Sequence, residues 1–149
     1  MHTNQYVKYT PDSLYVKDAE TLCAECTTDL EKVNKIYSHI VETYTYNSAR
    51  AILLARSTTA IPNAEWVYTH GSGICGDIAA LMTAMLRSQG IPTSLVIGLY
   101  GSTNHAWVRV YLDNSGTKFK DYDPTKGIKL KAARIKKTSP LKYVVKRWY

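Results

Sequence analysis

The sequence predicts a single α+β domain, with helices in the first part of the chain and an antiparallel β-sheet in the second. Apolar residues recur at helical spacing over 29–44 and 75–89, whereas from residue 93 onward β-branched runs and strict alternation replace that spacing. A length of 149 residues suits one domain with one core. Runs of helices followed by runs of strands are typical of the α+β class.

The first predicted helix covers residues 29–44. Thr28 and Glu31 have the spacing of a capping box, in which each side chain hydrogen-bonds to the other residue's backbone. Residues 1–26 show no regular pattern, so we predict an irregular segment there. Apolar residues within the helix recur every three or four positions, at Leu30, Val33, Ile36, Tyr37, Ile40 and Val41.

The second predicted helix begins at Cys75, directly after the glycine-rich stretch GSGIC. Nearly every residue of this helix is apolar or small, so we expect it to lie at the centre of the core. Gly90 stands at a natural C′ position and Pro92 prevents continuation. Residues 45–68 are ambiguous, because the segment AILLAR fits either a short helix or a buried turn and Pro62-Asn63 breaks the pattern after it.

The second half of the chain carries the strand patterns. A turn at 113–116 joins an alternating strand to its return strand and so predicts a β-hairpin. The predicted strands are residues 93–99, 105–111, 117–122, 128–132 and 143–148.

The net charge of +7 is unevenly distributed. Residues 124–149 hold nine Lys or Arg and no acid, which leaves a net charge of −2 on the first 123 residues. We favour a solvated strand edge protected by lysines, and the alternative is contact with an anionic cell-wall or surface polymer. No nucleic-acid motif accompanies these charges, and no run of about 18 apolar residues exists, so we expect neither a specific nucleic-acid partner nor a membrane span.

The three cysteines are Cys23, Cys26 and Cys75. The CAEC pair has no second CxxC or CxxH partner and no calcium-loop motif is present, so we expect no metal and no cofactor. The pair is then a local disulfide or two idle thiols, with a redox pair as the further alternative. The first residues lack a signal peptide's apolar run, yet we expect an extracellular or cell-surface protein whose leader lies outside this sequence, with the cytoplasm as the alternative.

Cys75 is the candidate nucleophile. It follows two glycines and opens a helix, where backbone amides and the helix dipole stabilise a thiolate. Taken alone, a cysteine at this position is more often a small buried apolar residue.

His105 and Asp123 are the candidate partners of a Cys75 nucleophile. Counted outward from the turn at 113–116, residue 105 falls opposite roughly residues 123–125, so the two side chains are predicted to be cross-strand neighbours. An Asp beside a His fixes the tautomer of the ring and stabilises the imidazolium. Asp121 is the rival carboxylate, and we prefer Asp123 because the register fits it better.

These segments resemble the transglutaminase-like superfamily, a branch of the papain-like thiol enzymes. The matching features are a glycine-flanked Cys opening a helix, a Gly-Ile-Pro after it, the His-Ala-Trp strand and Asp-Pro-Thr after the next strand. The stretch LEKVNKIYSHIVETYTYN also resembles the helix before the catalytic core of bacterial members. The likeness covers a core of about residues 29–125 within one domain over 1–149, with basic C-terminal strands over 126–149.

The resemblance implies a helix-flanked antiparallel sheet with the Cys helix packed on it. It makes Cys75 the nucleophile, His105 the base and Asp123 the orienting residue. Many relatives carry an aromatic residue, often Trp, between the turn that ends the preceding strand and the Asp, and here Phe119 or Tyr122 takes that place.

A second oxyanion donor is needed beside the backbone N–H of Cys75. The candidates are Tyr46, Asn47, Trp66 and His70, and we favour Tyr46 because the resemblance places a Tyr near the cleft. Two other residues have competing interpretations. Trp107 either walls the cleft or packs in the core, with the core favoured, and Asp77 either caps its own helix or tunes the site, with capping favoured.

The predicted reaction is acyl transfer from a peptide or amide through a thioester on Cys75. We favour hydrolysis over crosslinking, because a small single domain lacks the extra domains of animal crosslinking enzymes. The alternative function is a noncatalytic module that retains the fold and binds a peptide or polyanion.

Overall fold

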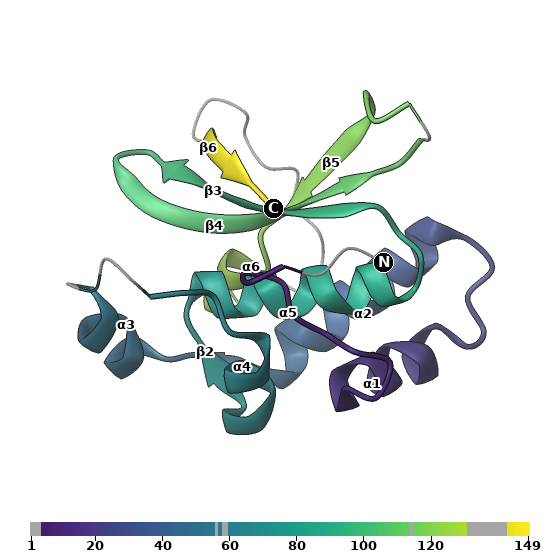
Figure 1. The fold of residues 1–149 in the computed structure, drawn as a ribbon, viewed down its shortest axis with the longest axis horizontal. Helices are drawn as coiled ribbons and strands as arrows, with labels where there is room; N and C mark the ends of the chain where they lie inside the picture. The colour runs from purple at the N-terminus through teal and green to yellow at the C-terminus, as the bar shows by residue number, and fades with distance from the viewer. Residues whose placement is uncertain (1–3, 56, 58–59, 114, 131–142) are drawn as a thin grey trace.

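The computed structural model describes residues 4–55, 57, 60–113, 115–130 and 143–149. Figure 1 shows a β-sheet lying over a layer of helices, with α5 directly beneath the sheet. The helices are α1 (Leu14–Cys23), α2 (Asp29–Thr43), α3 (Ser48–Leu54), α4 (Ala64–His70), α5 (Cys75–Ser88) and α6 (Pro124–Leu130). The strands are β1 (Thr45–Tyr46), β2 (Ser72–Gly73), β3 (Thr93–Tyr100), β4 (Thr103–Tyr111), β5 (Phe119–Tyr122) and β6 (Tyr143–Trp148).

The main sheet has the strand order β5-β4-β3-β6, and every neighbouring pair is antiparallel. Strands β4 and β5 form the predicted hairpin, in which Val108 pairs with Tyr122. The prediction of an α+β fold is therefore confirmed. No helix among the described residues combines the length and the apolarity that crossing a bilayer requires.

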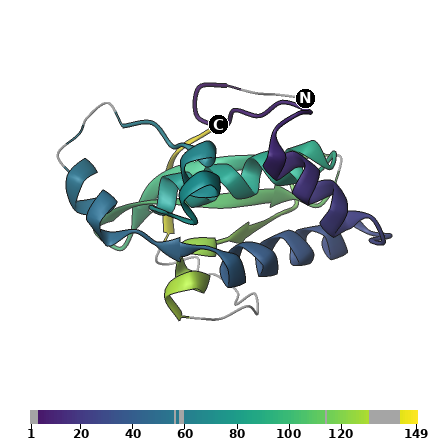
Figure 2. The same ribbon diagram turned by 90° about the horizontal axis from the view of Figure 1, so that it is seen from below.

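Helix α5 is the centre of the core. All of its residues from Asp77 to Leu86 are buried, so the helix is covered on every side. Figure 2, seen from below, shows the other helices arranged around it beneath the sheet. Gly90 follows the helix with a φ of 78°, a backbone conformation that suits glycine at C′, as the sequence predicts.

Two other predicted features are confirmed. Helix α2 starts with the capping box, in which Thr28 accepts from the backbone N–H of Glu31 and Glu31 accepts from that of Thr28. Residues 51–54 of the segment AILLAR belong to the short helix α3, yet none of the residues of this helix is buried. Ile52 and Leu53 are 78% exposed, so the buried-turn alternative is wrong.

Three predictions fail where local pattern and tertiary contact disagree. Residues 14–23, predicted as irregular, form α1 because four of its side chains pack into the core. Pro62-Asn63 is predicted to break the regular pattern, but helix α4 starts directly after it, because the Asn63 side chain caps this helix by accepting from the N–H of Trp66. Residues 128–130, predicted as the start of a strand, belong to α6, and residues 131 and 132 lie outside the described residues.

Helix α6 begins where the sequence suggests only a strand end. Asp123 accepts a hydrogen bond from the backbone N–H of Lys126 at 3.0 Å, which is the geometry of a helix cap. Pro124 stands in the first position of the helix, where its missing N–H is not needed.

Strand β6 joins the sheet through a close approach at Gly98. Gly98 lies opposite His105 on one side and Val145 on the other, at an irregularity in the β3–β6 pairing. A Cβ atom on Gly98 would overlap the carbonyl oxygen of Val144 and lie 2.9 Å from the Trp107 ring. Glycine is therefore required for β6 and Trp107 to lie this close to β3.

We expect Gly98→Ala to destabilise the protein by about 1–3 kcal/mol, the usual cost of inserting a methyl group into a packed site. Urea unfolding followed by circular dichroism measures it. Ser102→Ala, at an exposed position in the turn between β3 and β4, is the control and should change stability by less than about 0.5 kcal/mol. Equal stability of the two variants would contradict the close approach of β6.

Candidate active site

Cys75 is the first residue of α5 and lies at a cleft of about 190 Å³. The short parallel pairing of β1 with β2 leads into this position, with Tyr46 opposite Gly73. His105 from β4 lines the same cleft. The structure thus brings the predicted thiol and imidazole together from two elements that are 30 positions apart in the sequence.

His105 is held by Asp123. The distance from its Nε2 to Oδ2 of Asp123 is 2.7 Å, and both side chains are largely buried. Because Nε2–H donates to the carboxylate, Nδ1 is the ring nitrogen left to take a proton. The Cys75 thiol lies close enough to this ring to help raise its pKa.

Asp123 has further partners that fix its orientation. Oδ1 caps helix α6 through the backbone N–H of Lys126. Oδ2 accepts a second hydrogen bond, from the hydroxyl of Tyr143 at 2.9 Å. The ring of Tyr143 also packs against Trp107, with ring centroids 5.0 Å apart. Tyr143 is not predicted as a site residue from the sequence, where its only signal is its place at the start of a predicted strand.

These contacts shift the acidity of both partners. Burial by itself lowers the pKa of His105, but hydrogen bonds and charge from Asp123 and Cys75 outweigh it and raise the pKa to about 9. Burial likewise raises the pKa of Asp123, but the hydrogen bonds and charge of His105, together with the Lys126 and Tyr143 contacts, bring it below its ordinary value. The pair is therefore stabilised as carboxylate and imidazolium.

Asp121, the rival carboxylate, lies elsewhere. It forms a two-bond ion pair with Arg109, at 2.8 and 3.0 Å, and accepts from Trp107 Nε1 at 3.3 Å. Both contacts place it on the sheet rather than beside the His105 ring nitrogens.

The structure separates the candidates for a second oxyanion donor. Tyr46 is not one of the described residues that line the cleft, but burial and then the nearby charge of Cys75 raise the pKa of its hydroxyl. Trp66 does not line the cleft among the described residues. Its indole N–H is buried and has no hydrogen-bond partner in the described part of the chain. Trp107 is fully buried and does not line the cleft, but it lies outside the main core cluster, where it packs against Tyr143 and donates to Asp121. Asn47 caps α3 through its side-chain oxygen and donates to Ser72, while His70 stacks on Trp66.

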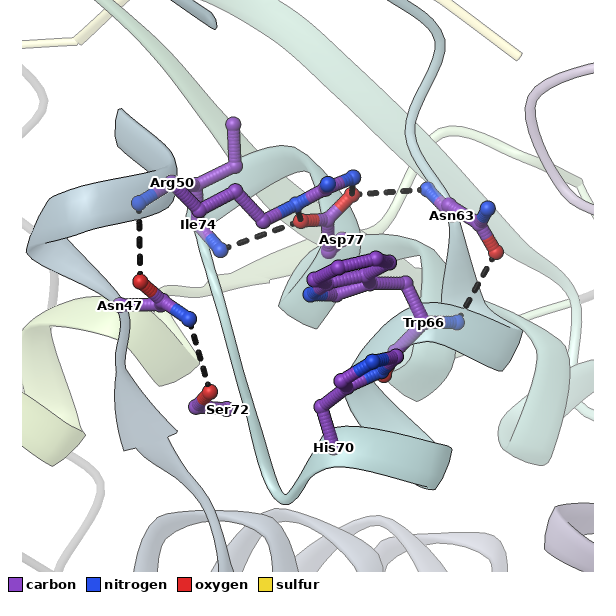
Figure 3. Close-up of polar contacts among 8 residues, drawn as sticks. All are labelled: Asn47, Arg50, Asn63, Trp66, His70, Ser72, Ile74 and Asp77. Atoms are coloured by element: carbon purple, nitrogen blue, oxygen red, sulfur yellow. Dashed lines mark hydrogen bonds and ion pairs between the residues drawn. The ribbon is translucent and has the colours of Figure 1, made fainter. Parts of the chain in front are cut away.

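Asp77 caps its own helix, as favoured, and does more than that. Figure 3 shows its carboxylate meeting the backbone of Ile74 and Asn63 and the guanidinium of Arg50. Sequence reasoning missed Arg50 and Asn63 because their partner is 27 and 14 positions away.

The remaining predictions have mixed outcomes. Cys23 and Cys26 are free thiols, so the structure shows the two-thiol alternative. Within the described residues no three His, Cys, Asp or Glu side chains gather to hold a metal ion. Much of the basic segment lies outside the described residues, so contact with an anionic polymer stays a prediction, as does an extracellular location.

Two lysines of the basic segment are described and contact aromatic rings: Lys126 lies over the ring of Tyr100, and Lys129 lies over the ring of Tyr46.

We expect the imidazole of His105 to titrate near pH 9, and Asp123→Asn to lower this midpoint, because the hydrogen bond and charge of the carboxylate are then lost while burial remains. Nitrogen-15 NMR of the histidine rings measures both. Asp121→Asn is the matched control and should leave the midpoint unchanged. A wild-type midpoint near 6.5 would contradict the pairing.

The same pair makes stability depend on pH. A histidine whose pKa is raised in the folded state contributes most below pH 6.5, and that contribution is lost as the pH rises through about 9. The difference in unfolding free energy between wild type and Asp123→Asn should therefore be on the order of 2 kcal/mol just below pH 6.5, where Asp123 is ionised, and should narrow above pH 9. Urea unfolding across this range measures it, and a difference that does not vary with pH would refute the charged pair.

Solved structures with this architecture include a candidate cysteine protease from Cytophaga hutchinsonii, with a TM-score of 0.65 and 24% identity over 91% of this chain and 43% of that one. A transglutaminase matches with a TM-score of 0.58 and 19% identity over 75% of this chain and 30% of that one. LapG of Legionella pneumophila matches with a TM-score of 0.55 and 14% identity over 87% and 78% of the two chains. These likenesses show the fold.

The chain spans less than half the length of the first two of these proteins. A comparison with curated protein sequences finds no match. Residues 17–124 match the model of the transglutaminase-like superfamily, which is most of the chain. The protein therefore belongs to the transglutaminase-like superfamily.

Proposed function

We propose that this domain is a cysteine hydrolase that cleaves amide bonds in proteins or peptides, with Cys75 as nucleophile, His105 as base and Asp123 as the orienting carboxylate. One observation carries the proposal: His105 hydrogen-bonds to Asp123 and lines the same cleft as Cys75, which is close enough to help raise the pKa of the imidazole. A noncatalytic peptide-binding module has no need of this chain of contacts.

The proposed reaction has two steps. With the pKa of His105 near 9, Nδ1 of His105 already holds the proton of the Cys75 thiol at neutral pH, so the sulfur attacks the carbonyl carbon and the imidazolium then gives its proton to the leaving amine. The thioester on Cys75 is then attacked by a water molecule that His105 deprotonates, and the acid product leaves. The backbone N–H of Cys75 at the start of α5 and the hydroxyl of Tyr46 are the proposed donors to the oxyanion.

Water is favoured over a lysine amine as acceptor because the side chains that react are not sealed from solvent. Cys75 is only partly buried, and His105 retains 16% of its side-chain exposure. Crosslinking requires that water be kept from the thioester.

The cleft also favours a type of substrate. Its walls beside Cys75 are mainly apolar side chains, contributed by Leu54, Ile61, Pro62, Ile97 and Ala106. A volume of about 190 Å³ accommodates one medium-sized apolar side chain rather than an extended charged one. We propose that an apolar residue of the substrate occupies it.

The hydrolase proposal is tested with a denatured protein substrate in heavy-oxygen water, with and without a fluorescent primary amine. Mass spectrometry should find new carboxylates carrying the heavy oxygen. Cys75→Ala should lower the rate by about 10³-fold or more. Amine-labelled products in place of carboxylates would show a crosslinking enzyme, and unmodified substrate with measurable binding would show a binding module.

The preference for an apolar side chain is tested with two peptides that differ only by Leu or Asp next to the amide. Burying a Leu side chain is worth about 1.5–3 kcal/mol, so kcat/KM should be roughly tenfold or more higher for the Leu peptide. Ile61→Asp, at a wall residue that is 45% exposed, should reduce this preference without unfolding the protein. Equal kcat/KM for the two peptides in the wild type would refute the assignment.

A further inference from the structure

Asp77 is a buried carboxylate two positions after the proposed nucleophile. Its side chain is 1% exposed, and it receives four hydrogen bonds from three segments. Oδ2 accepts from Arg50 Nε at 2.8 Å and from the N–H of Ile74 at 3.2 Å. Oδ1 accepts from the N–H of Asn63 at 2.9 Å and from Arg50 Nη2 at 3.4 Å. Asp77 therefore ties α3, the segment before α4 and the start of α5 together around Cys75.

This arrangement has an electrostatic consequence. The positive end of the α5 dipole stabilises one anion readily, but here it faces both the Asp77 carboxylate and a Cys75 thiolate. Two negative charges in the first turn of one helix repel each other, and burial strengthens the repulsion. A protein that needs both groups must neutralise one of them.

Arg50 supplies the opposite charge. Its guanidinium pairs with Asp77 through two bonds, and its side chain is 14% exposed. The guanidinium also lies 4.1 Å from the centre of the Trp66 ring, and Trp66 stacks on His70 with centroids 3.7 Å apart. Figure 3 shows the guanidinium of Arg50 and the rings of Trp66 and His70 stacked beside Asp77. This stacking restricts the position of the guanidinium.

We propose that Arg50 is a positioning residue that cancels the charge of Asp77, so that this carboxylate can fix the start of α5 without opposing the Cys75 thiolate. Among the described residues, the other titratable groups around Cys75 are His105 from β4, with Asp123 behind it, and Tyr46 from β1, over whose ring Lys129 of α6 lies. None of these groups contacts Asp77 in the described part of the chain, so the Arg50–Asp77 pair can be altered separately. The inference rests on the proposed function only in taking the Cys75 thiolate as the reactive form.

The test is the rate of Cys75 alkylation by iodoacetamide as a function of pH, read by mass spectrometry of the Cys75 peptide. Arg50→Gln should move the midpoint of this profile upward by about half to one pH unit, since the Asp77 charge is then uncompensated. Arg50→Lys keeps the charge without the two-bond geometry and should retain the wild-type midpoint. The double variant Arg50→Gln with Asp77→Asn should return close to it.

Arg109→Gln is the matched control, because Arg109 forms the same two-bond ion pair with Asp121 at 17% side-chain exposure but on the sheet. It should leave the midpoint unchanged. The proposal is overturned if Arg50→Gln gives the same midpoint as Arg109→Gln. If Arg50→Gln does not fold, Asp77→Asn decides the question: a downward shift supports the proposal and an unchanged midpoint overturns it.

Alkylation needs no substrate, so this result is separate from the test of hydrolysis. If Arg50→Gln shifts the midpoint of Cys75 alkylation but the wild type cleaves no amide, the hydrolase proposal is refuted and the proposed role of Arg50 is supported. If the wild type does cleave peptides, kcat/KM of Arg50→Gln should be lowered several-fold at low pH and recover as the pH rises, with KM unchanged. A deficit that is equal at every pH would indicate a merely structural role and overturn the proposal.

Discussion

The Asp123 carboxylate is the point on which the rest of the site depends. One oxygen caps helix α6, and the other accepts from His105 and from Tyr143. The same side chain therefore ends the β4–β5 hairpin, starts the helix that follows and orients the imidazole. A buried carboxylate is stable only when its oxygens are satisfied, and the donors that satisfy this one come from three separate elements.

A second buried carboxylate, Asp77, has a different role in the same region, because it holds the start of α5 in place. Asp123 is paired with a group that can lose its charge during a reaction, whereas Asp77 is paired with Arg50, which stays charged at all relevant pH values. This difference in partner separates the two functions. The Asp123 pair can respond to proton transfer, while the Asp77 pair keeps both its geometry and its zero net charge.

The elements that the sequence predicted well are those set by contacts close in sequence. The capping box of α2, the apolar helix α5 ending at Gly90, and the hairpin register that places His105 near Asp123 all depend on nearby residues and on turn geometry. Helices α1 and α4 were missed because they are short and are stabilised mainly by packing, which overrides weak local preference.

The site partners that escaped sequence reasoning are all long-range. Arg50 reaches Asp77 across 27 positions, and Tyr143 reaches Asp123 across 20. Neither residue type signals such a contact in a single sequence, because Arg is usually solvated and one Tyr among twelve has no distinguishing pattern. Only the register of the sheet and the layering of the helices reveal which Arg and which Tyr reach the site.

Strand β6 shows how far the site extends beyond its most recognisable motifs. The family match ends at residue 124, yet Tyr143 at the start of β6 donates to the carboxylate that orients His105. The close approach at Gly98, directly opposite His105, is what admits β6 to this edge of the sheet. A change that loosens β6 would remove a hydrogen bond from Asp123 without touching Cys75 or His105. The C-terminal strand is therefore part of the environment that sets the charge state of the proposed base, and the geometry of the site depends on the docking of this strand as well as on the residues that react.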